Sequence, residues 1–201
     1  MDLILIHGMG RTPLSLVMLR YRLKKLGYRA HLFGYSAAFE SLNRVTNRLV
    51  ALIHRLPNQN YGLIGQSLGT VIIRHALPRL KQQPKVCFLL APPILACKAA
   101  KLFSNVWLYR LLTGEMGQLL GQDAFMNKLT MPDSVKIYAG NAGPRASWLP
   151  LGNEVNDGLL TVAEASGRFS HKAMLVPTLH SFIMNSRAIF KDMTTYLEEK
   201  S

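Results

Sequence analysis

A serine between two glycines lies where the sequence changes from strand-like to helix-like. The G-x-S-x-G sequence 65–69 has Ser67 at its centre, follows the apolar run 61–64 and precedes a helical pattern. Gly65 and Gly69 permit a tight strand-to-helix turn, on which the serine hydroxyl projects as a nucleophile near the positive end of a helix dipole. The alternative is a glycine-rich turn of a nucleotide-binding fold, but neither G-x-G-x-x-G nor a Walker lysine is present.

A general base for this serine has to lie at the same edge of the predicted sheet. Of the six histidines, His180 alone comes directly after the last predicted strand, 173–176. The other five lie in a strand, in helices, before the last strand or after the first: His31, His54, His75, His171 and His7. His180 is therefore the predicted base. The alternative is a helix-capping or core histidine.

An acid that orients the histidine should follow a late strand at this edge. Asp157, in the sequence 153–158, follows the predicted strand 135–139 after a loop. Two alternatives stay open: Glu154 provides the carboxylate instead, or the Asn-Asp-Gly sequence is simply a turn. We take Asp157 as the predicted acid.

A second glycine-rich sequence, His7-Gly8-Met9-Gly10, follows the first predicted strand. Such a turn can direct backbone N–H groups at an oxyanion, the negatively charged oxygen that forms when a serine attacks a carbonyl. With Gly8 and Gly10 around Met9, the loop is a candidate oxyanion-stabilising element.

Together these motifs resemble the α/β-hydrolase superfamily, especially its small lipase- and esterase-like and GPI-inositol-deacylase-like members. The resemblance covers nearly the whole chain and includes the family order of serine, acid and histidine, with 156–158 and 180–182 as its last two motifs. It implies that the backbone N–H groups of Met9 and Leu68 form the oxyanion hole and that His7 is structural. It also implies that this chain is a minimal version of the fold.

Short apolar runs predict six buried strands, and helical patterns alternate with them. The predicted strands are 3–6, 28–33, 61–64, 86–90, 135–139 and 173–176. The predicted fold class is α/β, with an approximately six-stranded, mostly parallel sheet and helices on both faces. If the family order holds, the sheet runs 2-1-3-4-5-6, and its winding direction reverses between strands one and three.

The chain length of 201 residues predicts a single domain, 1–201. The interval 92–133 between the fourth and fifth strands is long and too apolar for a free loop. Two interpretations stay open, because periodicity does not separate them: ordinary core helices, or a helical cap over a binding pocket.

The composition predicts a cytoplasmic chain. Although 49% of the residues are hydrophobic, none of the apolar runs reaches the roughly 20 residues that span a bilayer. The N-terminus has no basic leader and no small-residue cleavage site. Cys87 and Cys97 are expected to be reduced thiols, since two such cysteines provide neither a disulfide framework nor a metal cage.

The formal net charge of +13 favours an anionic partner. Lys24-Lys25 is the only adjacent basic pair, so nucleic acid is an unfavoured partner. If Lys98, Lys101 and Arg110 flank an apolar cap, the partner is an anionic membrane surface, and the protein is peripheral to it. The alternative is a solvated face that keeps the chain soluble.

The sequence therefore predicts a serine hydrolase that cleaves carboxylic esters, among them lipid esters, other acyl esters and thioesters, through an acyl-enzyme on Ser67. No cofactor is expected. No metal is expected either, because no two histidines have the i, i+4 spacing of a zinc helix and acids are few. Two alternatives remain: an acyltransferase with the same three residues, or a non-catalytic basic protein that binds membrane or nucleic acid.

Overall fold

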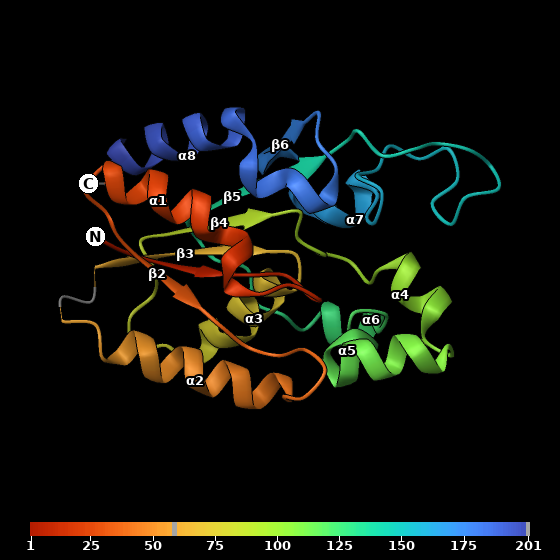
Figure 1. Cartoon of the computed structure of the whole chain (residues 1–201), viewed down its shortest axis with the longest axis horizontal. Helices are drawn as coiled ribbons and strands as arrows, with labels where there is room; N and C mark the ends of the chain where they lie inside the picture. Colours follow the sequence, from red (N-terminus) through yellow and green to blue (C-terminus); the bar gives the residue numbers. More distant parts are fainter. Residues whose placement is uncertain (58–59, 200–201) are drawn as a thin grey trace.

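Figure 1 shows the computed structural model, which describes residues 1–57 and 60–199. The strands are β1 (Asp2–Ile6), β2 (Arg29–Phe33), β3 (Tyr61–Gln66), β4 (Val86–Leu90), β5 (Val135–Gly140) and β6 (Ala173–Val176). The α-helices are α1 (Val17–Lys25), α2 (Leu42–His54), α3 (Leu68–Ala76), α4 (Lys98–Phe103), α5 (Trp107–Leu119), α6 (Asp123–Met126), α7 (Val162–Ser166) and α8 (Arg187–Glu199). The 3-10 helices are η1 (Pro13–Leu16), η2 (Leu77–Arg79), η3 (Gly167–Lys172) and η4 (His180–Asn185).

The strands form one sheet in the order β2-β1-β3-β4-β5-β6, and every neighbouring pair is parallel. The predicted order is confirmed, and the sheet is wholly parallel. Its winding direction reverses between β1 and β3, where open α/β sheets form clefts. Ile6 at the end of β1 pairs with Gly65 near the end of β3. The loops that follow the two strands therefore begin side by side.

Helices cover both faces of the sheet, and the inner strands β1, β3 and β4 are buried along their whole length. In β1, Ile4 and Ile6 belong to the core cluster that also contains side chains of α2 and α3. Leu3 and Leu5 belong to the cluster with α1 and α8. Figure 1 shows these two helix pairs on opposite sides of the sheet. The alternation of strand side chains thus builds two cores from one strand.

The interval 92–133 contains α4, α5 and α6 and lies at the end of the molecule opposite the N-terminus (Figure 1). Met116 and Met126 from this interval are buried in the core shared with α2 and α3. Trp107 and Leu111 on α5, in contrast, are 72% and 61% exposed. The interval therefore contributes to the core and also presents an apolar surface to solvent.

Arg74 on α3 attaches this interval to the rest of the fold. Its buried guanidinium donates to the carbonyl oxygens of Pro93 at 3.0 Å, Met126 at 3.2 Å and Leu129 at 3.4 Å. Burial lowers the pKa of Arg74 to about 10, so the side chain is still charged at neutral pH. One side chain thus fixes both ends of the interval against α3.

Candidate active site

Ser67 lies at the turn between β3 and α3 with φ 52° and ψ −118°, a conformation that costs strain in a non-glycine residue. Its backbone N–H donates to the Leu90 carbonyl oxygen at 2.8 Å and holds the turn in place. A Cβ atom on Gly65 would lie 2.8 Å from backbone atoms of α3, and one on Gly69 would overlap the carbonyl oxygen of Ile6. These close approaches explain why glycines stand on both sides of Ser67.

His180 and Asp157 form a buried polar pair. The His180 Nδ1 atom and the Asp157 Oδ2 atom are 2.7 Å apart, and the His180 backbone N–H donates to the Asp157 carbonyl oxygen at 2.8 Å. The other carboxylate oxygen accepts from the backbone N–H groups of Leu159 at 2.9 Å and Leu160 at 2.7 Å. The carboxylate is therefore held in one orientation. A proton on Nδ1 leaves Nε2 of the imidazole as a hydrogen-bond acceptor.

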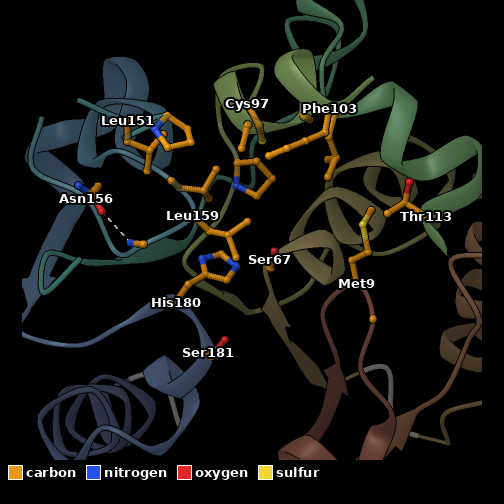
Figure 2. A pocket seen from close by; sticks show the side chains of 18 of the residues that line it. Met9, Ser67, Cys97, Phe103, Thr113, Leu151, Asn156, Leu159, His180 and Ser181 are labelled. Atoms are coloured by element: carbon orange, nitrogen blue, oxygen red, sulfur yellow. Dashed lines mark hydrogen bonds between the residues drawn. The ribbon is translucent and has the colours of Figure 1, made fainter. Parts of the chain in front are cut away.

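Ser67 and His180 line the same cavity, whose volume is about 390 Å³. Figure 2 shows the His180 imidazole beside the Ser67 hydroxyl. Glu154, the other acid considered from the sequence, instead forms an ion pair with Lys98 and is half exposed. The structure thus brings Asp157, and not Glu154, into contact with His180.

The other histidines have different surroundings. His31, in the middle of the outermost strand β2, contacts Asp2 at the start of β1 at 2.8 Å. The ring of His75 contacts the Thr46 hydroxyl at 2.9 Å. His54 is exposed on α2. His171 lies in η3, before β6, and lines a separate shallow groove.

His7 supports the loop that follows β1. Its Nδ1 donates to the Gly8 carbonyl oxygen at 2.9 Å, its Nε2 accepts from the Tyr35 backbone N–H at 3.4 Å, and the two rings stack at 4.3 Å. Burial lowers the pKa of His7, which favours the neutral ring that these two bonds require. The Gly8 backbone N–H in turn donates to the Gln66 side chain at 3.0 Å. Gln66 and Tyr35 were not singled out from the sequence. Gln66 occupies a variable position of the G-x-S-x-G pattern, and Tyr35 lies far from both motifs in the chain.

Met9 and Leu68, whose N–H groups the resemblance assigns to an oxyanion hole, flank Ser67 from different elements. In Figure 2, Met9 lies on the side of Ser67 away from His180. Gly10, with φ 65°, turns the chain immediately after Met9. Leu68 is the first residue of α3, and N–H groups at a helix start have no carbonyl partner within the helix.

Most of the remaining cavity wall is apolar. Its side chains come from α4, α5 and the loop 141–160, and they include Ala100, Phe103, Leu112, Leu149 and Leu151. Cys97 also lines the cavity, but burial and the nearby carboxylates of Glu164 and Asp157 raise the pKa of its thiol to about 12. The thiol therefore stays protonated and is a poor nucleophile.

In the part of the chain that the structure describes, no three His, Cys, Asp or Glu side chains are grouped as metal ligands would be. Within the same residues, no helix is both long enough and apolar enough to cross a membrane.

Comparison with known proteins finds similarity at the level of structure. No family model matches the chain, and no curated protein matches its sequence. The mature form of the lipase BlEst2 from Bacillus licheniformis superposes with a TM-score of 0.70 at 16% identity, covering 98% of this chain and 91% of the lipase. The metagenomic carboxyl esterase MGS0156 gives 0.69 at 16% identity, covering 100% of this chain and 76% of the esterase.

The ydeN gene product of Bacillus subtilis gives a TM-score of 0.67 at 14% identity and covers 98% of both chains. The chain therefore has a minimal α/β-hydrolase fold, and lipases and esterases are among the proteins it resembles structurally.

Proposed function

We propose that this protein is a serine hydrolase that cleaves carboxylic esters. In this mechanism Ser67 attacks the ester carbonyl while His180 Nε2 takes its proton, and the protonated imidazole then gives that proton to the leaving alcohol or thiol. Asp157 holds the imidazole and stabilises its positive charge. Water, activated by His180, hydrolyses the acyl-enzyme and regenerates Ser67.

The observation that carries this proposal is the 2.7 Å contact between His180 and Asp157, with His180 lining the same cavity as Ser67, which lies in a strained turn. Strain at a non-glycine residue persists where the surroundings enforce it, and it is common at catalytic nucleophiles. The N–H groups of Met9 and Leu68 are the proposed donors to the oxyanion. The proposed reaction requires no cofactor.

The acyl part of the substrate is proposed to occupy the wall formed by α4, α5 and the loop 141–160. This wall is mainly apolar, as a site for an acyl chain should be. It favours a lipid, another acyl ester or a thioester, and a lipid ester would also agree with the resemblance to GPI-inositol-deacylase-like proteins. The interval 92–133 would then act as a cap over the site.

A fluorophosphonate probe tests the proposed nucleophile, because it labels only an activated serine. We expect the natural chain to be labelled and Ser67→Ala to be neither labelled nor active, while its thermal unfolding stays close to that of the natural chain. Ser181→Ala is the matched control, since Ser181 lines the same cavity, and it should keep its label. Full labelling of Ser67→Ala would rule out Ser67 as the nucleophile.

An acyltransferase with the same three residues is distinguished by the fate of the acyl group. In that case, an added alcohol or thiol would take the acyl group in preference to water, and the transfer product would dominate. A purely binding protein on this fold would not be labelled at all. The buried and fully bonded Asp157 carboxylate favours catalysis over binding alone.

We also propose that the outer face of α4 and α5 contacts an anionic lipid surface. Large apolar side chains are exposed along this face and on the neighbouring loop: Leu102, Phe103, Val106, Trp107, Leu108, Leu111, Leu112 and Trp148. Exposed apolar patches of this kind are typical of membrane or protein contacts, and the net charge of +13 favours an anionic surface. Residues of α4, α5 and this loop also line the cavity that contains Ser67, so a lipid docked on this face would lie close to that cavity.

A further inference from the structure

Arg11 differs in charge from every other side chain of the cavity. The loop that carries Met9 and Gly10 continues into Arg11, which is half-buried and lines the cavity. Among the described residues that line the cavity, it is the only lysine, arginine, aspartate or glutamate. A cavity for a plain fatty acyl ester would gain nothing from a half-buried guanidinium, whose desolvation costs free energy.

The guanidinium has one defined partner at the site. Its Nη2 atom donates to the Ser181 carbonyl oxygen at 3.0 Å, which places it next to the residue that follows His180. Arginine has five N–H donors, so most of them remain for another acceptor. In the described part of the chain no carboxylate forms an ion pair with Arg11, whereas Lys98 and Lys101 pair with Glu154 and Asp123.

Because Arg11 is bonded to Ser181, the position of Ser181 shows which end of the cavity carries the guanidinium. Figure 2 shows Cys97, Phe103 and Thr113 on one side of Ser67 and His180, and Ser181 on the other. The reacting carbonyl would lie between them at Ser67. An acyl chain on the apolar side would thus leave the opposite side of the ester near Arg11.

We propose that Arg11 forms an anion subsite, and that the preferred substrates are esters that carry a carboxylate or phosphate group close to the scissile bond. The inference rests on the proposed esterase function. Guanidinium recognises both anions through paired N–H···O bonds, which are stronger than those between neutral groups. The subsite would select the alcohol side of the substrate, while the apolar wall selects the acyl side.

Binding of ethers that contain no carboxylic ester bond tests this subsite without relying on turnover. Titration calorimetry would compare 1-O-hexylglycerol, its 3-phosphate, and an analogue with a carboxylate in place of the phosphate. The short chain keeps all three ligands free of vesicles and micelles. We expect the natural chain to bind one or both anionic ethers about tenfold more tightly than the neutral one, and the tighter of the two identifies the preferred anion.

Arg11→Gln should reduce this preference to about threefold or less. Arg20→Gln is the matched control: it removes the same charge, and Arg20 also donates to a backbone carbonyl, that of Ala30, but it does not line the cavity. It should keep the full preference. A natural chain that binds charged and neutral ethers equally, or binds none of them, would overturn the proposal.

Equal losses of the preference for anionic ethers in Arg11→Gln and Arg20→Gln would also overturn the proposal. They would indicate that the overall positive charge of the protein, and not a subsite, attracts the anions. If Arg11 only connects the two loops through Ser181, Arg11→Gln should weaken the binding of the neutral and the anionic ethers alike. That result would also overturn the proposal. Fluorophosphonate labelling of Ser67, measured on the same samples, reports the proposed esterase function separately. Failure of the anion subsite is therefore distinguishable from failure of the nucleophile.

Discussion

On the side of the cavity that carries Ser67, polar groups hold one another in place, whereas on the side of α4 and α5 apolar side chains face both the cavity and solvent. Asp157 binds His180 with one oxygen and two backbone N–H groups with the other. On the other side, Trp107 and Leu111 are mostly exposed. The first side is held rigidly, as the proposed catalysis would require, and the second is the surface to which the substrate is proposed to bind.

The largest effect should come from the base on the polar side. His180→Ala should lower kcat/KM for a short-chain ester by at least about a thousandfold, because Ser67 loses its proton acceptor. His171→Ala, at the opposite end of β6, is the control and should change kcat/KM little. Measurement of both variants with a chromogenic ester checks the assignment. A reversed pair of effects would transfer the role of base to His171.

The next effect concerns the acid. Asp157→Asn should lower kcat/KM by about a hundredfold or more, because an amide favours the wrong tautomer of His180 while the local hydrogen bonds are largely kept. Glu154→Gln should have little effect, since Glu154 pairs with Lys98 instead. Steady-state kinetics of the two variants, with circular dichroism to compare their folds, provide the measurement. A large loss in Glu154→Gln alone would identify Glu154 as the orienting acid.

A smaller effect, on stability, should come from the attachment between the two sides. Arg74→Met should lower the free energy of unfolding by about 2–3 kcal/mol, because three buried carbonyl oxygens lose their donor. Arg79→Met is the control, because Arg79 is exposed and bonds to the side chains of Asn43 and Asn47. Urea unfolding of both variants gives the comparison. Equal stability of the two would show that Arg74 does not hold the interval 92–133.

The polar side of the cavity was largely predictable from the sequence, because Ser67, Asp157 and His180 each come after a strand of the sheet: Ser67 immediately, His180 after a short turn and Asp157 after a longer loop. Once parallel strands are recognised, Ser67, Asp157 and His180 have to meet at one edge of the sheet. The predicted sheet order also holds. The site roles of these three residues stay predictions that the experiments above address.

Residues that act through long-range contacts were not predictable in this way. Arg74 lies in an ordinary helical pattern, and it is buried only because the distant interval 92–133 packs over it. Arg11 follows a glycine turn, and its place in the cavity depends on the path of the loop around Ser181. The charge predicted to surround a cap is also reduced, since Lys98 and Lys101 are paired with acids.

A smaller effect is predicted for the apolar side and the proposed lipid contact. Trp107→Ser combined with Leu111→Ser should weaken binding to phosphatidylserine-containing vesicles by about tenfold, because two largely exposed apolar side chains no longer enter the bilayer interface. Leu26→Ser is the matched control: Leu26 is 50% exposed and directly follows α1, a helix that lies away from α4 and α5 in Figure 1. It should bind as the natural chain does.

Charge should contribute less than the apolar side chains at this surface. Arg110→Gln should weaken vesicle binding by about threefold, and this difference should shrink as salt rises to physiological strength, where screening acts over about 8 Å. Arg110 is chosen because Lys98 and Lys101 form ion pairs with Glu154 and Asp123, so replacing either lysine would also leave a carboxylate without its partner. Co-sedimentation at several salt concentrations measures both effects. Equal binding by the natural chain, the Trp107/Leu111 variant and Leu26→Ser at every salt concentration would refute the lipid contact. The exposed face of α5 would then contribute no more to binding than an unrelated exposed leucine.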